Sequence, residues 1–185
     1  MIDEVLKDAE SRMAKAVDAE RHDLINMRTG RANPSVLEGL QVQAYGASMP
    51  LMQLATISAP EPRMLTIQPY DRTVIGDIER AILKSDLGFN PTNEGTLIRI
   101  IIPQLTEERR RDMVKMVHKR VEESKVAIRN VRREAHDQLR KMLKNKEISE
   151  DEEDVAAEDL QKVTDRMIEQ ADGLGSTKEA EMMEV

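Results

Sequence analysis

Positively charged side chains recur at helical spacing between residues 125 and 140. In a helix with 3.6 residues per turn, six side chains would lie close to one line along the helix surface: Lys125, Arg129, Arg132, Arg133, His136 and Arg140. The planar guanidinium group of arginine suits phosphate oxygens and base edges better than the ammonium group of lysine does. Acidic residues are sparse between positions 125 and 133. We call Lys125, Arg129, Arg132 and Arg133 the basic stripe and predict that it binds a nucleic acid, because unpaired like charges are tolerated where a polyanion neutralises them.

A second interpretation of the basic stripe requires no ligand. Charged helix faces are often only solvated, and the stripe could pair with Glu122, Glu134 or Asp137. A helical adaptor or chaperone that never touches RNA would fit this interpretation. A general binder of double-stranded nucleic acid is a third possibility, and it predicts similar affinity for plain duplexes.

The net charge of −7 conceals a strong asymmetry along the chain. Residues 105–146 carry 14 basic and 7 acidic side chains, residues 147–185 carry 3 and 14, and residues 1–104 carry 11 and 14. Half of the basic residues therefore lie in less than a quarter of the chain. Such asymmetry predicts a polyanionic partner better than the total charge does.

The composition argues against several other functions. The chain has no cysteine, its three histidines lie apart without a metal-binding spacing, and no phosphate loop is present. We therefore predict no catalytic residue, metal site or cofactor, and we interpret the acidic run at 150–154 as a solvated helix start. Aromatic residues make up 2% of the chain, too few for binding by base stacking. Without a signal peptide or a long apolar run, we expect a cytoplasmic protein with no membrane contact.

Apolar periodicity predicts the elements that position the stripe. Residues 2–28, 106–145 and 149–184 each show an apolar line at helical spacing, with Thr106 and the pair Ser149 and Glu152 as capping signals. One long apolar line cannot bury itself, but three can bury each other. We predict an elongated antiparallel three-helix bundle built from residues 1–30 and 105–185.

The segment 31–104 has a different character. Six of the seven prolines lie between positions 50 and 103, and short β-like runs occur at 40–45, 54–58, 64–68 and 96–102, with a helix at 73–87. We predict an inserted, β-rich α+β domain. Two chain segments join it to the bundle, and such a connection favours a hinge. The predicted hinge consists of Gly30, Arg31, Pro103, Gln104 and Leu105.

Five segments resemble those of ribosome recycling factors, in the same order and over essentially the whole chain. They are Arg28–Ser35 (RTGRANPS), Lys84–Pro91 (KSDLGFNP), Leu105–Arg110 (LTEERR), Val126–Arg133 (VAIRNVRR) and Lys146–Asp151 (KEISED). The resemblance implies an L-shaped, tRNA-sized protein that binds the large ribosomal subunit after termination. It also implies that elongation factor G, which brings the GTPase activity, acts with the protein to separate the subunits.

The resemblance also implies which residues contact RNA. In the family, the arginines that match Arg28, Arg31, Arg129 and Arg132 face ribosomal RNA, and the smaller domain meets the partner factor. We predict RNA contacts at Arg28, Arg31, Arg110, Lys125, Arg129, Arg132 and Arg133. We expect a monomer in solution.

Two positions depart from the family pattern. The hinge reads Pro103-Gln104 where many relatives have two prolines, so we expect a less stiff connector. The last helix contains Gly173 and Gly175, and two interior glycines cost about 2 kcal/mol relative to alanine. We therefore expect the tail 176–185 to fray or bend.

Overall fold

The computed structural model describes residues 1–27 and 29–184, so Arg28 and Val185 lie outside the described residues. The chain forms two compact units. One comprises Met1–Met27 with Arg110–Val185, and the other comprises Arg28–Arg109.

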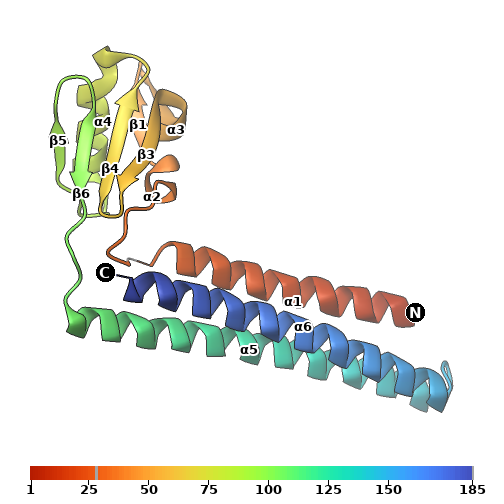
Figure 1. Cartoon of the computed structure of the whole chain (residues 1–185). Helices are drawn as coiled ribbons and strands as arrows, with labels where there is room; N and C mark the ends of the chain where they lie inside the picture. The colour runs from red at the N-terminus through yellow and green to blue at the C-terminus, as the bar shows by residue number, and fades with distance from the viewer. Residues whose placement is uncertain (28, 185) are drawn as a thin grey trace. The chain divides into compact units, whose positions relative to one another are not determined.

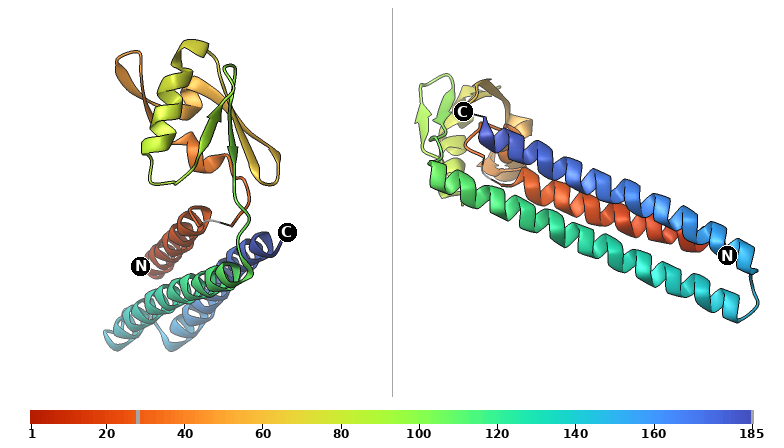
Figure 2. Two further views of the ribbon diagram at one scale, coloured as in Figure 1. Left: turned by 90° about the vertical axis from the view of Figure 1, so that its left-hand side faces the viewer. Right: turned by 60° about the horizontal axis from the view of Figure 1, so that its bottom comes forward.

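The first unit is a bundle of three long helices. These are α1 (Ile2–Ile25), α5 (Glu107–Lys144) and α6 (Glu150–Met183). In Figures 1 and 2 the three helices lie side by side, with α5 running opposite to α1 and α6. With 38 residues, α5 is about 57 Å long at the helical rise of 1.5 Å per residue.

Side-chain caps begin two of these helices. The Thr106 hydroxyl accepts a hydrogen bond from the Arg109 backbone N–H at 3.2 Å, and Ser149 and Glu152 form a reciprocal capping box. Both caps were predicted and are confirmed.

The apolar lines of the three helices meet in the bundle core. The buried apolar side chains fall into two separate clusters. The larger, which we call the distal cluster, contains Ala9, Met13, Val17, Ile128, Val131, Ala135, Leu139, Ala156, Leu160, Met167 and Ala171. The smaller, the connector-end cluster, contains Leu24, Val117, Val121 and Met182. It lies where the chain leaves the bundle after Met27 and returns at Arg110.

The second unit is built on antiparallel sheets. A four-stranded sheet has the order β3-β4-β6-β5, with β3 (Ala55–Glu61), β4 (Met64–Pro69), β6 (Ile98–Ile101) and β5 (Pro91–Asn93). A separate hairpin pairs β1 (Gln41–Ala44) with β2 (Ala47–Pro50). The helices are α2 (Ser35–Glu38), α3 (Leu51–Leu54), a 3₁₀ turn η1 (Arg72–Val74) and α4 (Ile75–Lys84).

Branched aliphatic side chains fill the core of this unit. Ile78 and Ile82 of α4 are fully buried together with Leu65, Ile67, Ile98 and Ile100 of the sheet. The β1–β2 turn has positive φ at both central residues, Tyr45 and Gly46, as a type I′ hairpin turn requires. The Tyr45 hydroxyl donates to Asp71 at 2.6 Å and lowers the pKa of that carboxyl.

The fold class agrees with the sequence prediction in both its helical and its β-rich parts. The sequence did not predict β2, β5, α2 and α3, each of four residues or fewer. One expectation is wrong: α6 continues through Gly173 and Gly175 to Met183 without a break. Packing explains this continuity, because a Cβ atom on Gly175 would lie 2.5 Å from Cγ2 of Val121, so the glycine allows α6 to lie close to α5.

Candidate nucleic-acid interface

The basic stripe lies along one flank of the buried line of α5. Each helical residue turns by about 100°, which places Arg132 nearer than Arg129 and Arg133 to the core residue Ile128. Burial follows this order: Arg132 is half-buried, whereas Arg129 and Arg133 are exposed. Arg129 and Arg133 are therefore open to solvent, and Arg132 is partly so.

The three arginines of the stripe have no partner in the part of the chain that the structure describes. No other described residue forms an ion pair or hydrogen bond with the side chains of Arg129, Arg132 and Arg133. Glu134, the carboxylate nearest in sequence, instead binds Arg12 of α1, with 2.7 Å between Nη1 and Oε2. This ion pair raises the pKa of Arg12. Of the three acids considered as partners for the stripe, Glu134 is thus engaged elsewhere, and Glu122 lies 3.4 Å from Lys125.

Lys125 differs from the rest of the stripe. Its ammonium lies 2.7 Å from Asp172 of α6 and 3.4 Å from Glu122, and its side chain is 17% exposed. The hydrogen bond to Asp172 raises the pKa of Lys125. A phosphate would have to displace Asp172 before Lys125 could bind RNA. The sequence could not reveal this pair, because it depends on how α6 packs against α5.

The other predicted contacts lie apart from the stripe. Arg110 is a half-buried residue near the start of α5, 19 positions before Arg129, or about 28 Å along the helix. Arg31 belongs to the second unit, where it is exposed and its backbone N–H donates to the Thr29 hydroxyl at 3.2 Å. Arg28 lies outside the described residues.

The predicted hinge residues contact each other and the β3–β4 turn. Gly30 has φ +74°, and a Cβ atom there would lie 3.1 Å from Cγ of Leu105. Gln104 accepts a hydrogen bond from Arg63 at 3.4 Å. Pro103 is exposed. The two connectors therefore lie against one another.

The backbone also holds both connectors to that turn. Ala32 N–H donates to the Pro62 carbonyl at 2.7 Å, and Ile102 N–H donates to the Arg63 carbonyl at 2.8 Å. Both bonds lie within the second unit. Hinge motion at these residues stays a prediction.

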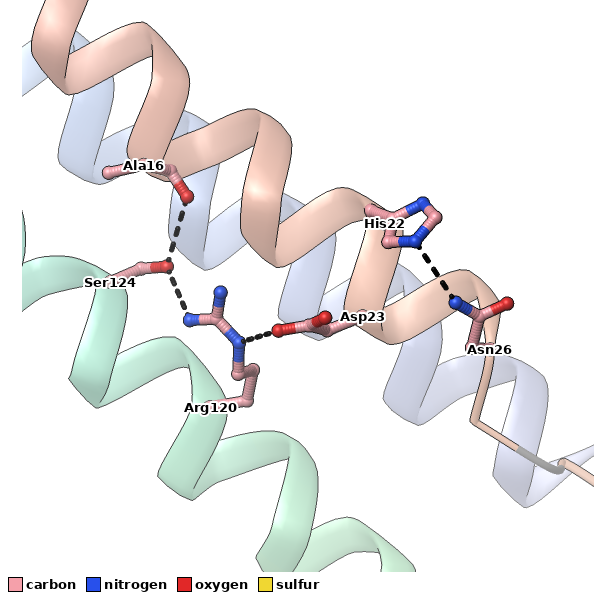
Figure 3. Close-up of polar contacts among 6 residues, drawn as sticks. All are labelled: Ala16, His22, Asp23, Asn26, Arg120 and Ser124. Atoms are coloured by element: carbon pink, nitrogen blue, oxygen red, sulfur yellow. Dashed lines mark hydrogen bonds and ion pairs between the residues drawn. The ribbon is translucent and has the colours of Figure 1, made fainter.

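A polar network fixes α5 against α1. As Figure 3 shows, Arg120 donates through Nε to Asp23 at 2.6 Å and through Nη1 to the Ser124 hydroxyl at 3.0 Å. Ser124 in turn donates to the Ala16 carbonyl at 3.5 Å. These bonds set the register of the two helices and so hold the stripe on a fixed face of the bundle.

Sequence reasoning missed one residue in this region, Glu20. It is completely buried, and neither carboxylate oxygen has a hydrogen-bond partner among the described residues. Burial raises its pKa to about 7. A signal was present in the sequence: Met13, Val17, Leu24 and Met27 mark the apolar line of α1, and position 20 falls on the same line.

Two other kinds of site are absent from residues 1–27 and 29–184. No three His, Asp or Glu side chains there are grouped so that they could hold a metal ion. None of the helices in these residues is long and apolar enough to span a membrane.

The chain matches known proteins over its whole length. The family model described as ribosome recycling factor matches residues 20–183. The ribosome-recycling factor of Roseiflexus castenholzii is 56% identical over 185 residues, which is all of both chains. The chain belongs to the ribosome recycling factor family. This family is one of translation factors.

Further relatives agree with this membership. The ribosome-recycling factor of Halalkalibacterium halodurans is 57% identical, again over all of both chains. A solution structure of a ribosome recycling factor is 42% identical and superposes with a TM-score of 0.83, covering 100% of this chain and 98% of the other. A second structure gives a TM-score of 0.69 at 47% identity, covering all of both chains. It presents the T. thermophilus factor and E. coli elongation factor G bound to the E. coli post-termination complex.

Proposed function

We propose that this protein binds the RNA of the large ribosomal subunit after termination and, with elongation factor G and GTP, splits the post-termination ribosome. The observation that carries this proposal is the group of three guanidiniums at Arg129, Arg132 and Arg133. Arg129 and Arg133 are exposed and Arg132 is half-buried, and none of the three has a partner among the described residues of this member of the ribosome recycling factor family.

Phosphate binding is the physical basis of the RNA contact. When arginines without carboxylate partners neutralise phosphates, the polyanion releases its condensed counterions, which makes binding favourable and dependent on salt. Contacts of this kind position a protein on RNA and do not read its sequence. We assign the main contribution to Arg129, Arg132 and Arg133. Arg28, Arg31, Arg110 and Lys125 are proposed as additional contacts.

Splitting requires a source of work outside this chain. We propose that elongation factor G supplies it through GTP hydrolysis and that the β-rich unit receives the movement of that partner. The connectors around Gly30 and Leu105 would then transmit this movement to the anchored bundle as a lever. The relative solved together with elongation factor G supports the choice of partner.

The protein's own role is mechanical in this proposal. It catalyses no reaction, and it acts as a monomer in the cytoplasm, where ribosomes complete termination. The scattered histidines and the absence of cysteine from the sequence support the non-catalytic role.

The test is the breakdown of post-termination complexes by this protein with elongation factor G and GTP. The informative variant replaces Arg129, Arg132 and Arg133 with glutamine. The matched control is Arg21→Gln, because Arg21 is an exposed arginine of α1 outside the stripe. We expect full breakdown with the unaltered protein and the control, and little with the triple variant.

Three outcomes would contradict the proposal. Breakdown of post-termination complexes without this protein, or without GTP, would show that splitting does not require the omitted component. Full activity of the triple variant would show that the arginines of the basic stripe are not needed for splitting. Equal affinity for plain RNA duplexes and large subunits would favour a general duplex binder.

A further inference from the structure

A polar layer divides the core of the bundle in all three helices. On α1, Glu20 lies between Val17 of the distal cluster and Leu24 of the connector-end cluster. On α5, the buried Ser124 lies between Val121 and Ile128. On α6, Gly175 and the buried Lys178 lie between Ala171 and Met182. The connector-end cluster is therefore set apart from the main core except at the half-buried Leu174, which packs against both clusters. Among the described residues the connector-end cluster contains four buried apolar side chains.

Glu20 is the member of this layer without a partner. Its side chain is 0% exposed, and both carboxylate oxygens lack hydrogen bonds among the described residues. An ionised carboxylate in such a position is costly, because it has lost its water and gained no donor. A protonated carboxyl carries no charge and avoids most of that cost.

The charged groups around Glu20 are already engaged with one another. From α5, Arg120 binds Asp23 and Lys125 binds Asp172 of α6. On α1, Arg21 binds Asp18. On α6, Lys178 lies 3.6 Å from Glu181. None of these cations donates to the Glu20 carboxylate in the described residues.

The pKa of Glu20 reflects this environment. Burial raises it most, to about 7, and the charge of Asp172 acts in the same direction. The positive charges of Arg120, Lys125 and Arg21 lower it and offset the rise only in part. Glu20 therefore exchanges its proton near neutral pH.

We propose that Glu20 is a proton-operated latch that holds the connector end of the bundle closed while it is protonated and lets that end open locally when it ionises. Local opening is the smallest change that returns the carboxylate to water, because only the connector-end cluster must separate. The distal cluster stays packed. The latch does not depend on RNA binding, so it can be tested on the isolated protein.

The direction of the pH effect follows from the two protonation states. The open state has an ordinary glutamate, with a pKa near 4.5, and the closed state has the raised value of about 7. The closed state therefore holds more protons between these values. Closure is strongest at acidic pH, weakens as the pH rises through about 7, and then levels off.

Amide hydrogen exchange of the full chain at about pH 5.5 and about pH 8.5, corrected for intrinsic rates, tests the latch. We expect protection of residues 113–121 to fall at least about tenfold more than protection of residues 128–139, since one pKa unit corresponds to a tenfold change. Glu20→Gln and Glu20→Leu should abolish this difference. Glu4→Gln, at an exposed glutamate of the same helix, should leave it unchanged.

His118 lies in the compared segment, 3.0 Å from Glu179, so its contribution must be separated from that of Glu20. It is unaltered in both Glu20 variants, and the difference between these and the unaltered protein therefore belongs to Glu20. Parallel loss of protection in both segments, or an unchanged pH response in Glu20→Gln, would overturn the proposal. Agreement between Glu20→Gln and Glu20→Leu also excludes an effect that belongs only to the glutamine side chain.

Discussion

Gly175 of α6 packs directly against Val121 of α5, at a distance that leaves no room for a side chain. A Cβ atom added to Gly175 would lie 2.5 Å from Cγ2 of Val121, whereas one added to Gly173 would have no atom within 4 Å. The two glycines therefore have opposite roles in the same helix. One permits close packing of α5 and α6, and the other only lowers helix propensity.

Alanine substitutions should separate these roles. Gly175→Ala should destabilise the bundle by about 1–3 kcal/mol, the usual cost of overpacking a core. Gly173→Ala should stabilise it by up to about 1 kcal/mol, because alanine favours the helix and nothing obstructs its Cβ. Urea unfolding followed by circular dichroism measures both. Equal effects of the two substitutions would show that the close approach at Gly175 does not matter.

The capping box at the start of α6 predicts a specific loss of stability. The Ser149 hydroxyl accepts from Glu152 N–H at 3.2 Å, and Glu152 accepts from Ser149 N–H at 2.8 Å. Ser149→Ala should cost about 1 kcal/mol of unfolding free energy. Ser176→Ala, at an exposed position inside the same helix, is the control and should be neutral or slightly stabilising. A neutral Ser149→Ala would mean that the helix start is held by other contacts.

The same cap should depend on pH. The hydrogen bond from the Ser149 backbone lowers the pKa of Glu152 below its ordinary value of 4.5. A lowered acid pKa stabilises the folded protein above that ordinary value, and the contribution is lost as the pH falls through the folded value. The stability difference between the unaltered protein and Glu152→Ala should therefore shrink in acid. A difference that grows in acid would contradict this assignment.

The Lys125–Asp172 pair predicts unequal roles within the basic stripe. Lys125→Ala should weaken binding to large subunits less than Arg132→Ala, because Lys125 is already neutralised by Asp172. Asp172→Asn should strengthen binding a few-fold by freeing Lys125 for a phosphate. Sedimentation with purified large subunits measures these affinities. Weaker binding by Asp172→Asn would show that the ion pair supports the interface and does not compete with it.

The contact between Gly30 and Leu105 predicts a cost for any side chain at position 30. Gly30→Ala should destabilise the second unit by about 1 kcal/mol, because L-residues disfavour positive φ and the new Cβ would press on Leu105. If the connectors transmit movement, this variant should recycle ribosomes more slowly yet bind large subunits normally. Gly39→Ala is the control, since that glycine has φ −87° and open space around it. Normal recycling by a destabilised Gly30→Ala variant would show that the connectors do not transmit the movement.

Long periodic patterns made the helices of the bundle predictable from the sequence. The apolar lines of α1, α5 and α6 extend over many turns, so local exceptions do not hide them. The line through Arg129, Arg132 and Arg133 was visible for the same reason. Short elements gave no such signal: β5 has three residues and begins with Pro91, a residue that disfavours strands.

Features that depend on how the helices pack could not be predicted. The contact of Gly175 with Val121 and the pair of Lys125 with Asp172 both require the register between α5 and α6, which no local pattern encodes. Interior glycines suggested a weak tail for α6, whereas tertiary packing keeps it helical. Glu20 was detectable in principle, because a charged residue interrupted an otherwise apolar line.

The salt dependence of binding to purified large subunits tests directly whether Arg129, Arg132 and Arg133 bind RNA phosphates. The comparison is between the unaltered protein and the variant with glutamine at positions 129, 132 and 133. We expect weaker binding by the variant and a plot of log affinity against log salt whose slope is shallower by about 2–3, since each phosphate contact contributes roughly 0.7–0.9. The same affinity and the same slope for both proteins would contradict this expectation.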